Sequence, residues 1–407
     1  MQAIQYVKSI PRYLAVRLLG KHIGGLYTSG VSCIRLTEIE EPRVIGAEWV
    51  KIRTCLSGIC GSDLATITAK GSPYFSPFTS CPFVLGHEVV GEIAEVGAEV
   101  EEYAIGDRIV IEPVLSCAIR GIQPFCYQCQ RGQFANCENI TKGDISSGIQ
   151  TGYCQDTGGG WSEYFVAHQN QLHHVPEELS DEIAVLAEPF ACALHGVLKA
   201  DLDEKAELLI IGAGTMGLLT VAVIRALGNT NRVLIVAKYP HQQKLARELG
   251  ADEIIPHDKH LYANFCRLTG AEAHQPELGK PVLLGGAGVT FDCVASSTTI
   301  DDALRFTRAQ GRVILVGMPA IPKNIDWTSI WYKELKVSGA YTYGVENYDG
   351  GQIRTYELGI QILGQMGDRL SPLIGERFPL QDYSGAIDSA LHTGRSGTVK
   401  TLFDLRK

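Results

Sequence analysis

Residues 208–217 read Leu-Leu-Ile-Ile-Gly-Ala-Gly-Thr-Met-Gly, an apolar run followed by a Gly-x-Gly-x-x-Gly pattern. Such a pattern is a weak signal alone, but here it links a strand-like run to a helical pattern. Gly212 permits a tight turn, Gly214 lets the backbone approach a pyrophosphate, and Gly217 lets helix and strand pack closely. Free N–H groups at the start of the helix then bind the phosphates. The residues that we expect at this cofactor site are Gly212, Gly214, Thr215, Met216 and Gly217.

Short β-branched runs alternate with helical patterns around this turn. The expected strands are Leu208–Ile211, Val233–Val236, Thr290–Val294, Val313–Val316 and Leu335–Val337. Two expected helices, Met216–Leu227 and His241–Leu249, are each followed directly by a glycine. This alternation is typical of βαβ units around a parallel sheet.

The rest of the chain has a different composition. Residues 1–190 carry many glycines and prolines, short strands such as Val50–Arg53 and Val89–Val96, and most of the cysteines. The C-terminal part offers a helix, Arg354–Gly364, and a strand, Thr398–Asp404, too little for its own domain. We expect it to rejoin the first domain and leave a cleft that suits an active site. The expected domains are residues 1–191 with 342–407, and residues 192–341.

Composition and charge exclude several functions. The chain has 407 residues, 36 basic and 45 acidic side chains, and a formal net charge of −9. Its 45% hydrophobic and 20% charged residues are typical of a folded globular protein. A net acidic chain without a basic stripe is a poor nucleic-acid ligand, so we expect no nucleic-acid partner. No apolar run approaches the roughly 20 residues of a membrane span, so we expect no membrane partner either.

The N-terminus does not read as a signal peptide, because basic residues between Lys8 and Lys21 interrupt every candidate apolar core. We therefore expect a cytoplasmic protein. In a reducing compartment, clustered cysteines indicate metal binding or catalysis rather than disulfides.

The cofactor preference depends on the segment after the glycine turn. NAD sites usually have an acidic residue about 20 residues after the last glycine, which accepts from the ribose hydroxyls. Residues 218–247 contain no Asp or Glu, and Lys238 and Tyr239 follow the expected strand. A lysine attracts the 2′-phosphate of NADP, so we favour NADP over NAD. Tyr239 is expected near the adenine and His241 as a weaker contact; alternatively, Lys238 is only a solvated loop lysine.

A second group of residues has the chemistry of a metal site. Cys60 and His87 both stand in the N-terminal, cysteine-containing part of the chain, and Glu88 follows the histidine directly. A thiolate, an imidazole and a carboxylate suit zinc. Glu188 is a further carboxylate, and it precedes the glycine turn at Gly212. The alternatives are a buried thiol, a hydrogen-bonded histidine and, for Glu188, a carboxylate that only supports the ligands.

Together these motifs resemble the zinc-dependent medium-chain dehydrogenase/reductase family, the alcohol dehydrogenase superfamily. Within it, Gly-His-Glu and Glu-Pro resemble the sorbitol, threonine and glucose dehydrogenase branch. The resemblance covers nearly the whole chain and implies an α/β fold: a β-rich GroES-like catalytic domain and a Rossmann domain with a doubly wound parallel sheet. It implies a catalytic zinc on Cys60, His87 and Glu88, with Glu188 as alternative or exchanging ligand. It also implies that Ser62 relays the proton; the alternative is a simple turn serine.

Two residues shortly after Cys60 bear on this resemblance, one in agreement with it and one as a departure from it. We expect Asp63 to orient His87, as carboxylates often do for metal-binding histidines; the alternative is an ordinary helix cap. Ala65 stands where family members often carry a histidine that ends the proton relay. The proton exit is therefore open, and water with one of the glutamates is an alternative.

A cysteine cluster further along resembles the structural-zinc lobe of the family. Cys126, Cys129 and Cys137 match three of its four cysteines, but Gln123 occupies the position of the first. Cys117 precedes Cys126 by nine residues and is our candidate for the fourth ligand. Four thiolates would form a closed tetrahedral site with no catalytic role. The alternative is a lobe that binds no metal.

These features predict a zinc-dependent, NADP-dependent alcohol or polyol dehydrogenase. Its partners would be a small-molecule alcohol, polyol or carbonyl substrate, and the resemblance implies a homotetramer or homodimer. The alternatives are an NAD-linked sugar or threonine dehydrogenase and, outside enzymes, a nucleotide-binding protein with a vestigial site. The zinc cysteine comes about 20 residues later than the family suggests. The extra stretch, Arg12–Cys33, is expected to pack on the catalytic domain, cover the cleft or mediate oligomers.

Overall fold

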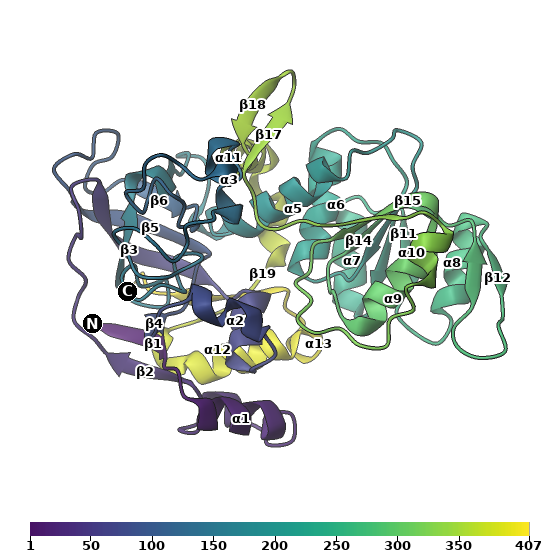
Figure 1. Cartoon of the computed structure of the whole chain (residues 1–407), viewed down its shortest axis with the longest axis horizontal. Coiled ribbons are helices and arrows are strands. Elements are labelled where there is room, and N and C mark those ends of the chain that lie inside the picture. Colours follow the sequence, from purple (N-terminus) through teal and green to yellow (C-terminus); the bar gives the residue numbers. More distant parts are fainter. Residues whose placement is uncertain (407) are drawn as a thin grey trace. The chain divides into compact units, whose positions relative to one another are not determined.

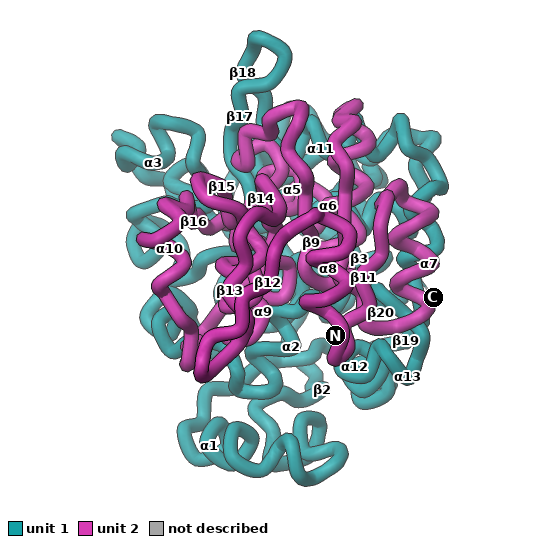
Figure 2. Tube along the Cα trace, turned by 90° about the vertical axis from the view of Figure 1, so that its right-hand side faces the viewer, with its two compact units in different colours: residues 1–188, 343–407 teal, residues 189–342 magenta. Residues whose placement is uncertain are grey.

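The computed structural model describes residues 1–406, which divide into two compact units. Unit 1 contains residues 1–188 and the C-terminal segment that begins at Tyr343; unit 2 contains Pro189–Thr342. Figure 2 gives the N-terminal and C-terminal segments of unit 1 one colour and the inserted unit 2 another. The chain therefore leaves unit 1, folds unit 2, and returns.

Unit 2 is built around a parallel sheet with strand order β11-β10-β9-β14-β15-β16 (Figure 1). Counted along the chain this is the order 3-2-1-4-5-6 of a doubly wound Rossmann sheet, so the predicted fold class is confirmed. Its strands are β9 (Leu208–Ile211), β10 (Val233–Ala237), β11 (Glu253–Pro256), β14 (Ala287–Asp292), β15 (Thr307–Leu315) and β16 (Lys336–Gly339). Its helices are α5 (Ala187–Lys199, which begins in unit 1), α6 (Thr215–Ala226), α7 (Pro240–Glu248), α8 (Leu261–Thr269), α9 (Ser297–Phe306) and α10 (Thr328–Tyr332).

The sequence located these strands because parallel strands are buried on both faces and therefore read as apolar runs. All residues of β9 and β10 are buried, and β9 has the expected bounds. The strand expected to end at Val294 instead ends at Asp292. There the Asp292 carboxylate accepts hydrogen bonds from the backbone of Val294 and Ala295, and Ala295 has φ +53°. A turn held in this way cannot continue the strand.

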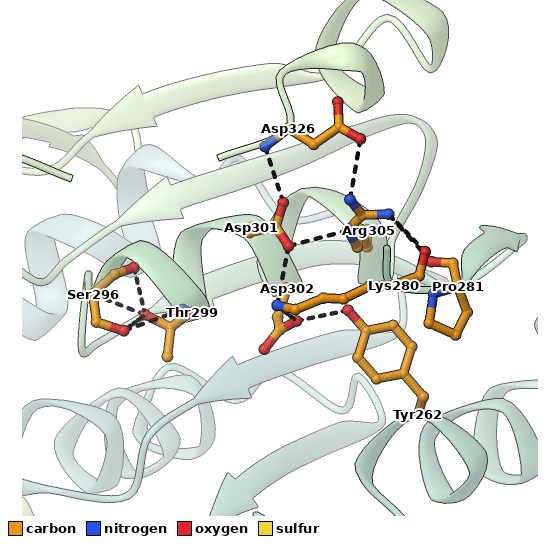
Figure 3. Close-up of polar contacts among 9 residues, drawn as sticks. All are labelled: Tyr262, Lys280, Pro281, Ser296, Thr299, Asp301, Asp302, Arg305 and Asp326. Atoms are coloured by element: carbon orange, nitrogen blue, oxygen red, sulfur yellow. Dashed lines mark hydrogen bonds and ion pairs between the residues drawn. The ribbon is translucent and has the colours of Figure 1, made fainter. Parts of the chain in front are cut away.

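Two short strands that the sequence did not indicate lie beside α9. The strands β12 (Glu272–His274) and β13 (Val282–Leu284) form a hairpin, and a polar network ties it to α9. The Lys280 amine lies 3.0 Å from Asp301 and 2.6 Å from Asp302, both buried. The Asp301 carboxylate also accepts from Arg305, whose guanidinium reaches the Lys280 carbonyl (Figure 3). Charged groups buried here are therefore paired.

Unit 1 is β-rich. Its larger sheet has the order β19-β20-β3-β5-β6-β8, with β7 also on β3, and a smaller sheet has the order β2-β1-β4. The strands are β1 (Gln2–Tyr6), β2 (Ile34–Glu38), β3 (Trp49–Gly58), β4 (Phe83–Val84), β5 (Val89–Val96), β6 (Arg108–Ile111), β7 (Tyr164–His168), β8 (Leu172–His174), β17 (Val345–Tyr348), β18 (Gly351–Arg354), β19 (Ile374–Phe378) and β20 (Lys400–Asp404). The helices are α1 (Ile10–Leu19), α2 (Gly61–Ile67), α3 (Tyr127–Gln130), α4 (Asp181–Ala184), α11 (Thr355–Met366), α12 (Tyr383–Leu391) and α13 (Thr393–Ser396). The short 3₁₀ helices are η1 (Leu26–Thr28), η2 (Pro73–Phe78), η3 (Phe134–Asn136), η4 (Gln169–Gln171), η5 (Gly367–Leu373) and η6 (Leu380–Asp382).

The C-terminal strand completes the larger sheet. β20 pairs antiparallel with β3, and Leu402 lies opposite Gly58 at the end of β3. This pairing brings the start of β20 beside the segment that leads to Cys60. Within residues 1–406 no helix combines the length and the apolar character that a bilayer crossing requires.

A buried arginine holds the lobe that carries the clustered cysteines. Arg120 has no exposed surface. Its guanidinium donates hydrogen bonds to a group of main-chain carbonyls. The acceptors are Leu115, Lys142, Ile145, Ser146 and Gly148, at 2.6–3.2 Å. Burial lowers the pKa of Arg120. The side chain thus connects the segment at Leu115 with the segment at Gly148, on either side of the lobe.

Candidate active site

The turn between β3 and α2 positions the candidate zinc cysteine. Cys60 precedes the first residue of α2 and has an extended backbone, with φ −87° and ψ 155°. Its backbone N–H donates to Asp63 Oδ2 at 3.0 Å, and Asp63 is fully buried. An acidic side chain in the first turn satisfies an otherwise unpaired N–H of the helix start. The sequence Cys-Gly-Ser-Asp thereby fixes the cysteine locally.

His87 lies against the same turn. Its Nδ1 is 3.4 Å from Asp63 Oδ1, and its Nε2 is 3.3 Å from Ser62 Oγ. Burial acts to lower the pKa of His87, but Asp63 and Cys60 outweigh it and raise that pKa well above its usual value. A carboxylate that holds one ring nitrogen orients the other, as in many metal sites. The arrangement agrees with the expected orienting role of Asp63.

Glu88 contacts a lysine that the sequence reasoning missed. The Glu88 carboxylate pairs with the amine of Lys400, at the start of β20, and both side chains are almost completely buried. The Lys400 amine also donates to the Ile59 carbonyl at 3.2 Å. Burial acts to lower the pKa of Lys400, but Glu88 and Cys60 raise it above its usual value. No local pattern indicated this role, because Lys400 reaches Glu88 only through the pairing of β20 with β3.

Gly58 leaves the space for this pair. A Cβ at Gly58 would collide with the Glu88 carboxylate and lie 2.8 Å from Lys400 Cε. The close approach of these two charged side chains therefore requires a glycine at the end of β3.

The donor atoms form a compact set. One atom each from Cys60, His87 and Glu88 lie within 4.8 Å of one another. Sulfur, imidazole nitrogen and carboxylate oxygen are the ligands that zinc takes in catalytic sites, so these residues fit the ion chemically. Glu188, at the start of α5, is buried but is not in this set among residues 1–406. The charge of Glu188 contributes to raising the pKa of Lys400. Its role as an exchanging zinc ligand stays a prediction.

Two hydroxyls beside the set were also missed from the sequence. The Tyr153 ring centroid lies 6.1 Å from that of His87, and the Tyr153 hydroxyl lies 3.1 Å from Thr66 Oγ1. Thr66 in turn donates to the Ser62 carbonyl at 3.0 Å. The two side chains thereby brace the first turn of α2. No local sequence pattern indicated Tyr153 or Thr66, although Thr66 follows Ala65 directly.

The second cysteine cluster also assembles. Sulfur atoms of Cys117, Cys126, Cys129 and Cys137 lie within 4.8 Å of one another, so Cys117 joins the other three cysteines. The backbone N–H of Cys126 and the side-chain amide of Asn139 both point at the Cys117 sulfur. A hydrogen bond from Cys129 lowers the pKa of Cys137 to about 5. N–H groups directed at clustered sulfurs suit thiolates, so the set fits a structural zinc ion.

The glycine turn of unit 2 has the geometry expected from the sequence. Gly212 has φ +97°, a value that favours glycine. A Cβ at Gly217 would collide with the Gly212 carbonyl, whereas a Cβ at Gly214 would meet no atom within 4 Å. Thr215 and Met216 begin α6 directly after the turn. The turn follows β9, where the strand order reverses toward β14, the usual position of a dinucleotide site.

Lys238 lies directly after β10 and is exposed. Its amine lies 5.2 Å from the centroid of the Tyr239 ring, which is stacked with His241 at 5.8 Å. β10 is the second strand of the sheet, and the residue at its end commonly faces the adenosine ribose in this fold. A cation occupies that position here.

Comparisons with known proteins identify related families for both units of the chain. Residues 46–177 match the family described as alcohol dehydrogenase GroES-like domain, and residues 215–355 match the family described as zinc-binding dehydrogenase. Together these matches cover both cysteine-containing candidate metal sets, but not Glu188, and most of unit 2.

Relatives and solved structures match over nearly the whole chain. An L-threonine 3-dehydrogenase of Paraburkholderia phytofirmans is 31% identical over 90% of this chain and 94% of its own length. An L-idonate 5-dehydrogenase of Vitis vinifera is 28% identical, over 89% of each chain. The crystal structure of 2R,3R-butanediol dehydrogenase from Bacillus subtilis has a TM-score of 0.71 at 26% identity and 99% coverage of both chains. A putative zinc-binding dehydrogenase of Sinorhizobium meliloti, bound to NADP, has a TM-score of 0.69 at 25% identity and covers 91% of this chain and 95% of its own. The chain belongs to the zinc-dependent medium-chain dehydrogenase/reductase family, the alcohol dehydrogenase superfamily.

Proposed function

We propose that the protein transfers hydride between a secondary alcohol or polyol and NADP, at a zinc site formed by Cys60, His87 and Glu88. The observation that carries this proposal is the compact donor set, in which His87 and Glu88 are buried and Cys60 is half-buried, with the Asp63 carboxylate beside His87. The curated relatives act on threonine and idonate, which supports a small polar alcohol as the substrate class. Residues 192–341 would bind the dinucleotide.

The residues around the donor set have separate tasks. A zinc ion bound there would act as a Lewis acid that lowers the pKa of the substrate alcohol. The Asp63 carboxylate, 3.4 Å from His87, would orient that ring, and Ser62 Oγ, 3.3 Å from His87, would take the alcohol proton. Because Ala65 cannot continue a relay, water and a glutamate would carry the proton onward.

Lys400 balances the charge of the site. The Cys60 thiolate and the Glu88 carboxylate together carry two negative charges, and the buried amine of Lys400 opposes the second. Zinc keeps its Lewis acidity best when few anionic ligands bind it. We infer that the pairing with Lys400 weakens the binding of Glu88 to the ion and so favours its exchange with Glu188 or water.

NADP is the proposed cofactor because a cation stands at the end of β10. The nearest acidic residue after the glycine turn is Glu248, at the end of α7. A 2′-phosphate would therefore meet Lys238 and no carboxylate from residues 218–247. The NADP-bound structure from Sinorhizobium meliloti supports this choice.

We further propose a homodimer or homotetramer in the cytoplasm. The edge strand β16 and the preceding α10 support an interface between copies, since Trp331 and Tyr332 of α10 are 70% and 60% exposed. Large exposed aromatic side chains beside an open sheet edge are typical of contact sites.

A substrate screen run in parallel with NAD and NADP tests the function. We expect alcohol-dependent formation of NADPH, with polyols and short secondary alcohols among the substrates, and turnover lost after zinc is removed. Higher turnover per bound cofactor with NAD for every substrate would contradict the NADP assignment. If threonine with NAD is the best pair, the enzyme is a threonine dehydrogenase like its curated relatives. Dinucleotide binding without turnover of any alcohol would favour the vestigial site.

A further inference from the structure

A basic helix with exposed apolar residues stands near the start of the chain. α1 is fixed on unit 1 by Val16, which is 2% exposed, and by the Tyr13 hydroxyl, which donates to the Ala69 carbonyl at 3.4 Å. Beyond α1, the buried side chain of Leu26 anchors the 3₁₀ turn η1. In Figure 1, α1 lies at the margin of unit 1, beyond β2. The segment is thus an ordered element with one packed side.

Its other side is apolar and open. Ile10, Leu14 and Leu18 are spaced four residues apart, so they share one side of the helix. They are 68%, 48% and 66% exposed. Further exposed apolar side chains of the same segment are Leu19, Ile23 and Val31. Exposed apolar groups gathered in this way mark an interaction surface more often than scattered single residues do.

The charge of the segment is opposite to that of the chain. Residues 1–37 contain five basic and no acidic side chains, whereas the rest of the chain contains 31 basic and 45 acidic ones. Lys8 and Lys21, on either side of α1, are exposed. Neither forms an ion pair with any residue that the structure describes. The same charges on a second copy would repel this face across a two-fold axis, whereas an anionic surface would attract it.

We propose that this face, which we call the α1 face (residues 8–31), docks on an anionic lipid bilayer. Apolar side chains of an amphipathic helix enter the boundary between headgroups and acyl chains, and flanking lysines stay among the headgroups. The expectation of no membrane partner rested on the absence of a spanning run, which peripheral docking does not need. The α1 face precedes residues 46–177, the range of the first family match, and supplies no residue to the proposed hydride transfer.

Vesicle co-sedimentation of the full-length protein tests the proposal. We expect the protein to sediment with phosphatidylcholine vesicles that contain phosphatidylglycerol and to stay in solution with phosphatidylcholine alone. High salt should release it, because screening weakens the attraction between lysines and anionic headgroups. Equal sedimentation with both vesicles, or with neither, would overturn the proposal.

Two double variants separate the contributions. Leu14→Ser with Leu18→Ser, and Lys8→Gln with Lys21→Gln, should each lower vesicle affinity at least about fivefold. Both should leave the folded state and dehydrogenase turnover unchanged, since none of these side chains is buried. Variants that sediment like the parent protein would refute the assignment.

Matched controls lie elsewhere on the surface. Ile105→Ser removes an apolar side chain that is 67% exposed, and Lys142→Gln with Lys205→Gln removes the same charge from exposed positions. These controls should bind vesicles like the parent protein. If light scattering instead shows self-association that Leu14→Ser with Leu18→Ser abolishes, a second copy covers the α1 face and the lipid proposal is wrong. The outcome is independent of whether any alcohol proves to be a substrate.

Discussion

At the scale of single residues, the buried ion pair of Glu88 and Lys400 is the contact at this site that depends most on the fold. The two are far apart in the chain and meet only because β20 pairs with β3. Local patterns indicated Cys60, His87 and Glu88, since those residues stand in short recognisable motifs. The sequence could not indicate Lys400, because its role depends on a pairing between the two ends of unit 1.

Replacing Lys400 by methionine should slow the reaction without removing the metal. The freed Glu88 carboxylate would bind zinc more tightly and weaken its Lewis acidity, so we expect kcat to fall at least about tenfold. Zinc content should stay the same, and the visible spectrum of the cobalt-substituted protein should shift. Lys400→Arg, which keeps the charge, is the control. An unchanged kcat together with an unchanged cobalt spectrum would show that Lys400 is only structural.

Lys238 makes the cofactor preference testable with one substitution. Lys238→Asp places a carboxylate where the 2′-phosphate is expected, so the KM for NADP should rise at least about tenfold while the KM for NAD stays the same or falls. The matched control is Lys244→Asp, on an exposed lysine of α7. If both variants change the two KM values alike, the proposed contact is absent.

At the scale of elements, Arg120 determines how the cysteine lobe is held. Arg120→Met would leave main-chain carbonyls without donors in a buried region, so we expect a loss of about 3 kcal/mol or more in the free energy of unfolding. Denaturant titration measures it, with Arg131→Met, an exposed arginine of the same lobe, as the control. Because the lobe carries the second cysteine cluster, Arg120→Met should also lose zinc more readily to chelators. Stability within about 0.5 kcal/mol of the parent would contradict this role.

The elements differ in how far the sequence predicted them. β9, the glycine turn and α6 were predicted almost to the residue, because apolar runs and glycines act locally. The β12–β13 hairpin was not, since its strands are short and largely exposed and their place depends on Lys280 reaching the two aspartates of α9. The spacing of Cys117 pointed to a fourth ligand, but only the folded lobe could bring its sulfur to the others.

At the scale of the whole molecule, Lys333 links stability to pH. Burial, and then the charge of Arg305, lower its pKa from the usual 10.5 to about 8, and its amine donates to the carbonyls of Arg305 and Thr307. Between about pH 8 and 10.5 Lys333 therefore keeps its proton in the unfolded chain but loses it in the folded one, so its own contribution makes stability rise with pH in that window.

Comparison with Lys333→Met isolates the effect. The free energy of unfolding of the parent minus that of the variant should increase by on the order of 3 kcal/mol between pH 8 and 10.5. Urea titrations at several pH values provide the measurement. A difference that stays constant, or falls, across the window would mean that Lys333 keeps its usual pKa in the folded protein.

The central claim, a zinc ion on Cys60, His87 and Glu88 that serves hydride transfer, is tested most directly by metal content measured on Cys60→Ser alongside the parent protein. Two assembled donor sets predict two zinc ions per chain in the parent. Cys60→Ser should retain one, held by the cysteines of the other set, should bind NADP like the parent, and should have no dehydrogenase activity. A variant that keeps both zinc ions and full turnover would contradict the claim.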